Sequence, residues 1–85
     1  MDQKTVKAIV LQTVADAAGL DSTVINPDAD LVDDLHMDSL AVFEVVVDLE
    51  SRFNLRIPDE VIDQLRSIER ITAYIERELD TNSHA

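Results

Sequence analysis

The 85-residue sequence lacks cysteine and tryptophan and contains a single glycine, Gly19. Without cysteine the chain can form no disulfide framework, no thiolate nucleophile and no cysteine-ligated zinc site. Two prolines and three aromatic residues (two Phe, one Tyr) mean that turn signals and strand-forming side chains are also scarce. Because aliphatic residues dominate instead, the composition favours an all-α fold.

Long apolar runs are missing as well. No stretch approaches the ~20 apolar residues that a membrane span needs. Residues 1–4 lack the basic-then-apolar pattern of a secretory signal, so a cytoplasmic location is expected.

A chain this short has room for one hydrophobic core. We expect one domain over residues 1–80 and a flexible tail over residues 81–85.

Basic residues are few, since seven Lys and Arg stand against eighteen Asp and Glu, a net charge of −11. Residues 21–64 hold twelve of the acids and only two of the bases. Such a negative field repels phosphate backbones and argues against nucleic acid as a partner. A basic protein surface or a divalent cation is the natural complement.

A built metal site is not expected. Neither His36 nor His84 has a second histidine three or four residues away, as a helical zinc pair would require. The acidic run at residues 28–33 lacks the glycine and the final glutamate of a calcium-binding loop.

Helical spacing of apolar residues predicts a first helix over residues 3–18. Asp2 is its expected N-cap, and Gly19 is the expected left-handed residue at its end. A long loop follows over residues 20–37. Three apolar residues are expected to pin this loop across the core: Leu31, Val32 and Leu35.

A second helix is predicted over residues 39–53, with Asp38 as its N-cap. It carries two apolar stripes on opposite sides. The first is expected to face the core and comprises Val42, Val45, Val46, Leu49 and Phe53. The second comprises Leu40, Phe43 and Val47, with Glu44, Glu50 and Ser51 around it. In a domain with few other helices this second stripe has no obvious burial partner. It is ordinary exposed apolar surface, a set of residues that contact the long loop, or a docking patch.

Two further helices complete the prediction. The third is short, begins at a capping Asp59 and includes Val61, Ile62 and Leu65. The last is capped by Ser67 and ends near Leu79. Its buried stripe comprises Ile68, Ile71, Tyr74, Ile75 and Leu79. The predicted fold is an all-α, up-and-down four-helix bundle with three longer helices, one short helix and a long first loop.

The chain is not expected to be an enzyme. Ser39 is a candidate nucleophile, but the G-x-S-x-G elbow is absent. No base is evidently placed to take its proton, because His36 precedes the helix start by three residues. Taken alone, Ser39 is an ordinary serine of a first helical turn.

Three motifs, taken together, change this interpretation. D-S-L stands at residues 38–40, I-P-D-E at residues 57–60 after Phe53, and a helix ending in Tyr-Ile at residues 71–75. In an acidic chain of this size, this combination resembles the acyl carrier protein family over nearly the whole sequence. The resemblance implies that Ser39 carries 4′-phosphopantetheine, transferred from coenzyme A by a phosphopantetheinyl transferase, with Asp38 flanking the site. A chain without cysteine would then import the thiol that holds acyl groups as thioesters.

The resemblance also implies two surfaces. Partner enzymes with basic patches, both acyl-loading and acyl-processing, would dock on Asp34, Asp38, Leu40, Phe43, Glu44, Val47 and Glu50. An acyl pocket would be lined by Leu31, Val42, Val45, Val46, Leu49, Ile57, Ile62, Leu65 and Ile71. A monomer serving fatty-acid, polyketide or a specialised acyl-transfer pathway is expected.

The sequence also departs from the family pattern. His36 stands where the family usually has glycine, and Ala41 and Ser51 stand where many members are acidic. Ile62 and Ile71 are bulkier than the small residues common at their positions. Two alternatives remain open: an aminoacyl or peptidyl carrier, whose motif is usually G-G-x-S, and an unmodified acidic helical adaptor.

Overall fold

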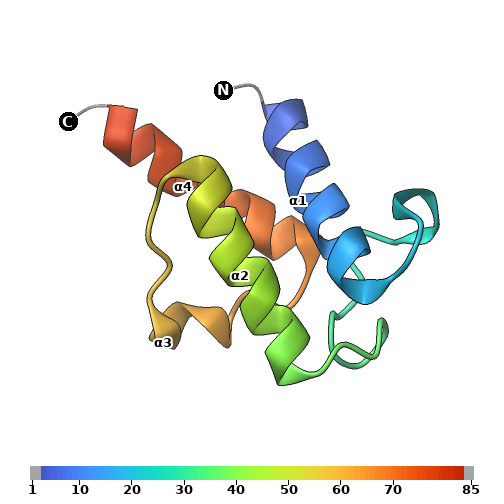
Figure 1. The fold of residues 1–85 in the computed structure, drawn as a ribbon. Coiled ribbons are helices and arrows are strands. Elements are labelled where there is room, and N and C mark those ends of the chain that lie inside the picture. The colour runs from blue at the N-terminus through green and yellow to red at the C-terminus, as the bar shows by residue number, and fades with distance from the viewer. Residues whose placement is uncertain (1–2, 84–85) are drawn as a thin grey trace.

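Four α-helices and one 3-10 helix make up the fold, with no strand among residues 3–83, the part of the chain that the structure describes. In this computed structural model they are α1 (Gln3–Ala18), η1 (Ser22–Val24), α2 (Ser39–Phe53), α3 (Asp59–Ile62) and α4 (Ile68–Ser83). Helix α1 packs against both α2 and α4, and the short α3 lies between the loop that leaves α2 and the start of α4 (Figure 1). The all-α four-helix architecture is confirmed.

The ends of α1 and α2 follow from local chemistry. Gly19 has a φ of 70°, the left-handed conformation that ends α1 as predicted. Asn54 has a φ of 51°, and its N–H bonds the Glu50 carbonyl to close the last turn of α2. The expected N-cap of α1, Asp2, lies outside the described residues. Both helices therefore have the predicted bounds.

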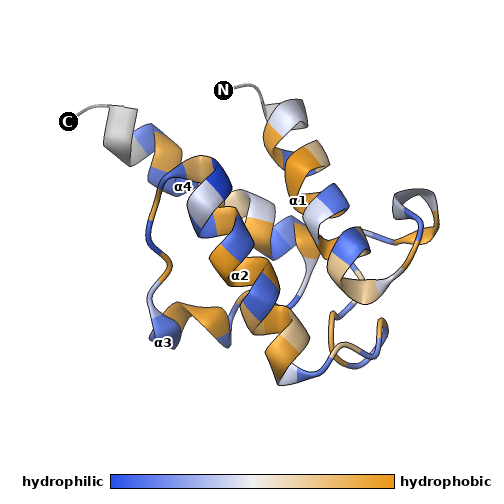
Figure 2. Ribbon diagram, in the orientation of Figure 1, coloured by the Kyte–Doolittle hydropathy of each residue, from blue (hydrophilic) through white to orange (hydrophobic). Residues whose placement is uncertain are grey.

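The core draws on every long helix and on the first loop. Its buried apolar residues are Val6, Val10, Val14, Ala15, Ile25, Leu31, Met37, Val45, Val46, Leu49, Phe53, Ile57, Leu65, Ile68, Ile71 and Ile75. Figure 2 shows hydrophobic and hydrophilic segments alternating along the helices, as expected for helices that bury one side. Ile25 and Met37 of the loop belong to the core, although the sequence pattern did not identify them.

One of the predicted loop anchors is wrong. Leu31 is 1% exposed and Leu35 is half-buried, but Val32 is 44% exposed. The backbone turns tightly here, because the N–H groups of Asp34 and Leu35 both bond the Asp30 carbonyl. A turn that directs Leu31 inward directs its neighbour toward solvent.

The two C-terminal helices differ from the prediction at their ends. Pro58, not Asp59, is the N-cap of α3, and α3 stops at Ile62, so the buried Leu65 lies beyond it. Ser67 does cap α4, since its Oγ accepts a hydrogen bond from the Arg70 N–H at 3.2 Å.

Helix α4 continues to Ser83, four residues past its predicted end at Leu79. Ala85 and the residue before it lie outside the described part of the chain. The flexible tail over residues 81–85 stays a prediction.

Thr72 of α4 is one of three buried polar residues in the described part of the chain, with Thr13 and Ser67, and it differs from them in its hydrogen bonding. It is 6% exposed, and its hydroxyl has no hydrogen-bond partner among the described residues. Thr72→Val should therefore raise the free energy of unfolding by about 1 kcal/mol, which is roughly 4–8 °C in Tm for a domain of this size. Thr13→Val is the matched control, because the buried Thr13 hydroxyl donates to the Ile9 carbonyl at 2.7 Å. A Thr72→Val melting curve no higher than that of the Thr13 variant would contradict the assignment.

Candidate functional site

Ser39 is the first residue of α2, and its side chain is exposed. Asp38 before it has extended backbone (φ −83°, ψ 174°), and its carboxylate accepts the Ala41 N–H at 2.8 Å. The Asp38 carbonyl accepts the Val42 N–H at 3.1 Å, which starts the helical hydrogen bonds. The predicted cap is thus confirmed, and it fixes Ser39 at the exposed head of the helix.

The same geometry gives the Ser39 hydroxyl a polar setting. The cap uses the Ala41 N–H, so the N–H groups of Ser39 and Leu40 lie at the helix head without an intrahelical acceptor. These groups and the helix dipole favour an anion on the Ser39 oxygen. The nearby carboxylate of Asp38 opposes that anion. An exposed hydroxyl at a helix head fits a phosphodiester, while the neighbouring acid fits recognition by a cationic enzyme.

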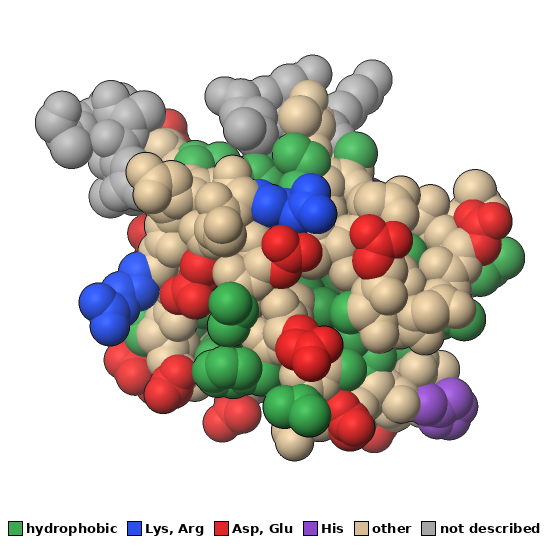
Figure 3. Space-filling model, in the orientation of Figure 1, with side chains coloured by type: hydrophobic (Ala, Val, Ile, Leu, Met, Phe, Trp, Pro, Cys, Tyr) green, Lys and Arg blue, Asp and Glu red, His purple; other side chains and the backbone are tan. Residues whose placement is uncertain are grey.

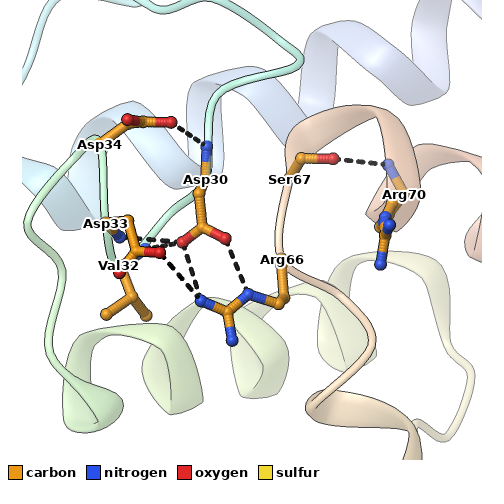
Figure 4. A network of polar contacts seen from close by, with 7 residues as sticks. All are labelled: Asp30, Val32, Asp33, Asp34, Arg66, Ser67 and Arg70. Carbon is orange, nitrogen blue, oxygen red and sulfur yellow. Dashed lines mark hydrogen bonds and ion pairs between the residues drawn. The ribbon is translucent and has the colours of Figure 1, made fainter.

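Asp30 organises the loop that leads to Ser39 (Figure 4). Its carboxylate accepts the N–H groups of Val32 at 2.9 Å and Asp33 at 2.8 Å. It also accepts Arg66 Nε at 2.7 Å and Nη2 at 3.2 Å, a bidentate pair. The Leu31 N–H bonds the Arg66 carbonyl at 2.8 Å. The loop is therefore clamped to the connection between α3 and α4 by both backbone and side chain.

This pair makes the loop sensitive to acid. The Arg66 hydrogen bond, helped by the Asp33 N–H, lowers the pKa of Asp30 from 3.8 to about 2. A lowered folded-state pKa contributes stability that is complete above about pH 4 and is lost as the pH falls through about 2. The Tm difference between the wild type and Asp30→Asn should therefore shrink over that interval. A Tm difference between the two proteins that stays constant down to about pH 2 would contradict the lowered pKa of Asp30.

His36 adopts a left-handed conformation, with a φ of 59°. Such a conformation costs a non-glycine residue of order 1 kcal/mol or more. It turns the chain so that the next residue, Met37, is 4% exposed and its N–H reaches the Leu31 carbonyl at 3.0 Å. The His36 side chain is exposed.

The second apolar stripe of α2 is exposed in the structure. Leu40 is 67% exposed, Phe43 49% and Val47 48%. Glu44 beside them is also exposed. Figure 3 shows hydrophobic side chains gathered among carboxylates on the face of the molecule where α2 lies. We call Leu40, Phe43, Glu44 and Val47 the α2 patch.

Two carboxylates predicted at this surface also have internal partners. Glu50 is half-buried, and its Oε2 accepts the Ile57 N–H at 2.7 Å, which closes the loop after α2. Asp34 Oδ2 accepts the Asp30 N–H at 2.8 Å. Both residues therefore stabilise loops, a role that the sequence did not indicate.

The predicted acyl-pocket residues do not share one cavity. Four of them line a hollow of ≈140 Å³ that also includes Ser39: Leu31, Val42, Ile62 and Leu65. Val46, Ile57 and Ile62 line a second, more polar hollow of ≈400 Å³. The remaining three line neither and are at most 1% exposed: Val45, Leu49 and Ile71. In this structure these three side chains fill the core between the long helices, and their assignment to an acyl pocket stays a prediction.

Other residues line the hollow beside Ser39 that the sequence did not identify, namely Val32, Asp63 and Arg66. The exposed Val32, misjudged as an anchor, is part of this wall.

Among the described residues, no group of three or more metal-ligating side chains is gathered. No described helix is long and apolar enough to cross a membrane.

Comparison with known proteins gives a consistent set of relatives. The sequence model of a family described as "Phosphopantetheine attachment site" matches residues 8–75. An acyl carrier protein of Syntrophobacter fumaroxidans is 37% identical over 75 residues, 88% of this chain and 93% of that protein. The meromycolate extension acyl carrier protein of Mycobacterium tuberculosis is 31% identical over 83 residues, 98% of this chain and 72% of that protein.

Solved structures show the same fold. An acyl carrier protein from Enterococcus faecalis superposes with a TM-score of 0.75 at 25% identity, covering 88% of this chain and 95% of that one. A free-standing peptidyl carrier protein from Acinetobacter baumannii superposes with a TM-score of 0.82 at 24% identity, covering 92% and 96%. At that identity the second likeness concerns the fold alone.

Proposed function

The chain belongs to the acyl carrier protein family, a family of carriers rather than catalysts, and on that premise we propose that Ser39 is the residue that receives 4′-phosphopantetheine. A phosphopantetheinyl transferase would supply the base and any metal. The Ser39 Oγ–phosphorus bond forms as the pyrophosphate bond of coenzyme A breaks, the hydroxyl proton passes to the enzyme's base, and adenosine 3′,5′-bisphosphate leaves. The observation that carries this proposal is the exposed Ser39 at the capped head of α2, within the matched residues 8–75.

Once attached, the group supplies a terminal thiol that holds an acyl load as a thioester. The protein's own residues then have three tasks. Asp38 holds the helix head and hence the attachment oxygen in place. The hollow beside Ser39 is lined by Leu31, Val42 and Leu65, and it would shield the first carbons of an acyl chain from water. The α2 patch is the surface that partner enzymes would bind.

An acyl load is favoured over an aminoacyl load. The attachment motif is D-S-L at residues 38–40 rather than the G-G-x-S usual in peptidyl carriers. The relatives of 31% and 37% identity are also named acyl carrier proteins. We propose fatty-acid or polyketide-type synthesis, or a dedicated acyl-transfer pathway, as the setting, and a cytoplasmic monomer as the working form.

Partner enzymes are proposed to present basic patches to the α2 patch. Its apolar residues are exposed and bordered by the carboxylate of Glu44, which suits a partner with an apolar depression rimmed by Lys or Arg. Electrostatic attraction to a chain of net charge −11 would speed encounter and weaken as salt is added.

Intact mass measurement tests the carrier assignment. The protein is incubated with coenzyme A and a phosphopantetheinyl transferase of broad specificity and then weighed. We expect a gain of one phosphopantetheine, and fragmentation should locate the added mass on Ser39. Mass unchanged with several competent transferases would overturn the carrier assignment and favour the unmodified adaptor.

Phe43→Glu should slow the transfer of the arm or of the acyl load by roughly 10–100-fold, the range of a central interface residue. It removes an apolar contact and adds a charge at the centre of the α2 patch. The measurement is the initial rate of mass gain, with far-UV circular dichroism to verify that the helices remain. Val24→Glu is the control, because Val24 is a 70% exposed apolar residue of η1, outside α2. Equal rates for the two variants would remove the docking role from Phe43.

A further inference from the structure

Ile62, the last residue of α3, stands between two hollows. The ≈140 Å³ hollow beside Ser39 and the ≈400 Å³ hollow beside the loop after α2 are lined by different residues, with this single exception. Ile62 lines both. Its side chain is half-buried, and its carbonyl is held by the Leu65 N–H at 3.0 Å, so its backbone position is fixed.

The two hollows follow one another along α2. Ser39 and Val42 line the first, whereas Phe43 and Val46 line the second. Val42 and Val46 are four residues apart in one helix, which places them on the same face and about 6 Å apart along the axis. The acyl chain begins at the thiol of the arm, and a chain that enters the hollow beside Ser39 and runs along α2 meets Ile62 before it reaches the second hollow.

The first hollow is small. An apolar cavity of about 150 Å³ admits one benzene molecule, so a hollow of ≈140 Å³ has room for roughly six carbon atoms. The second hollow has the volume for a longer chain, ≈400 Å³, and its wall combines the apolar Phe43, Val46 and Ile57 with charged residues, namely Glu50, Arg56, Asp59 and Glu60. Ile62 stands between it and the first hollow.

We propose that Ile62 is a partition that limits the chain sheltered beside Ser39 to about six carbons, and so determines which acyl loads this carrier protects. The inference rests on the function proposed above. A short acyl chain is buried in the first hollow, while the far end of a longer chain stays in water. A smaller residue at this position joins the two hollows into one channel.

Thermal stability of loaded protein tests the partition. The wild type, Ile62→Ala and Ile62→Val are loaded from acyl-coenzyme A donors with chains of four to sixteen carbons, and loading is verified by intact mass. The measured quantity is the Tm of each loaded form minus the Tm of the same variant with the bare arm. Each buried methylene should add roughly 3–6 °C. In the wild type the gain should level off near six carbons, whereas in Ile62→Ala it should continue to rise with chain length.

Val61→Ala is the matched control, because Val61 is the adjacent, similarly half-buried residue of α3 and lines neither hollow. It should level off where the wild type does. Ile62→Val, which loses one methyl group, keeps the test meaningful if the alanine variant is too unstable to load.

A wild-type gain that rises steadily to sixteen carbons would overturn the partition. So would identical profiles for the wild type and both Ile62 variants. These failures are distinguishable from failure of the proposed function, in which intact mass would show that no variant acquires the arm at all.

Discussion

Ser39→Ala is expected to acquire no phosphopantetheine under conditions that modify the wild type completely. The substitution removes the hydroxyl oxygen that would attack phosphorus, and alanine keeps the helix start because the cap belongs to Asp38. The loss should be complete rather than partial, since a methyl group cannot replace the nucleophile. Intact mass over a time course measures it.

Ser51→Ala is the matched control for this loss. Ser51 is also an exposed serine of α2, but it lies near the opposite end of the helix. It should be modified at the wild-type rate, and both variants should show the wild-type far-UV spectrum. Residual modification of Ser39→Ala, or a comparable defect in Ser51→Ala, would show that another hydroxyl or a general loss of structure is responsible.

Leu49→Ala is expected to lower the free energy of unfolding by about 2–5 kcal/mol, the usual cost of such a cavity. Leu49 is 0% exposed and lies at the centre of the core. A domain of this length has a total stability of roughly 4–13 kcal/mol, so the variant would lose a large part of it. Urea unfolding measures the change, and Tm should fall by at least about 10 °C.

Val47→Ala, two residues earlier on α2, is the control for Leu49→Ala. It separates the loss of stability caused by removing a buried side chain from any change caused by helix propensity. Val47 is 48% exposed, so its truncation should change stability by no more than about 0.5 kcal/mol. Similar losses for the two variants would mean that the two faces of α2 are not distinguished as described. A small loss for Leu49→Ala alone would mean that the core closes around the cavity.

Local signals made the long helices predictable. The bounds of α1 and α2 follow from apolar spacing together with Gly19 and Asp38, all of which act within a few residues along the chain. The exposed second stripe of α2 followed from periodicity alone. The proposal that Ser39 carries the arm followed from the D-S-L motif in its wider pattern, because no other feature of the sequence distinguishes this serine.

What the sequence could not predict depends on contacts between distant segments. The Asp30–Arg66 pair joins residues 36 positions apart, and no local pattern specifies it. The bond from the Ile57 N–H to Glu50 spans seven positions and gives a structural task to a residue that periodicity places near the outer face. Such bonds form only when the fold brings the segments together.

The sequence also could not predict which apolar residues line a pocket and which fill the core. Periodicity indicates that Leu49 faces inward, but it does not tell how far the next helix stands from that face. Ile62 and Leu65 belong to a short segment whose path is decided by tertiary packing. Only the assembled structure shows that Ile62 borders two hollows while Leu49 borders neither.

Helix α2 is bracketed by two non-glycine residues with positive φ, His36 at 59° and Asn54 at 51°. The left-handed backbone conformation restricts which residues are tolerated at positions 36 and 54. A library of variants selected only for folding should therefore be enriched in glycine and asparagine at both positions. Ser39 lies between them in an unstrained, exposed position that such a library would leave nearly free. Selecting the same library for attachment of the arm should add serine at position 39 to the requirements at positions 36 and 54. Comparing the two selections would therefore separate the positions needed for folding from the position needed for chemistry.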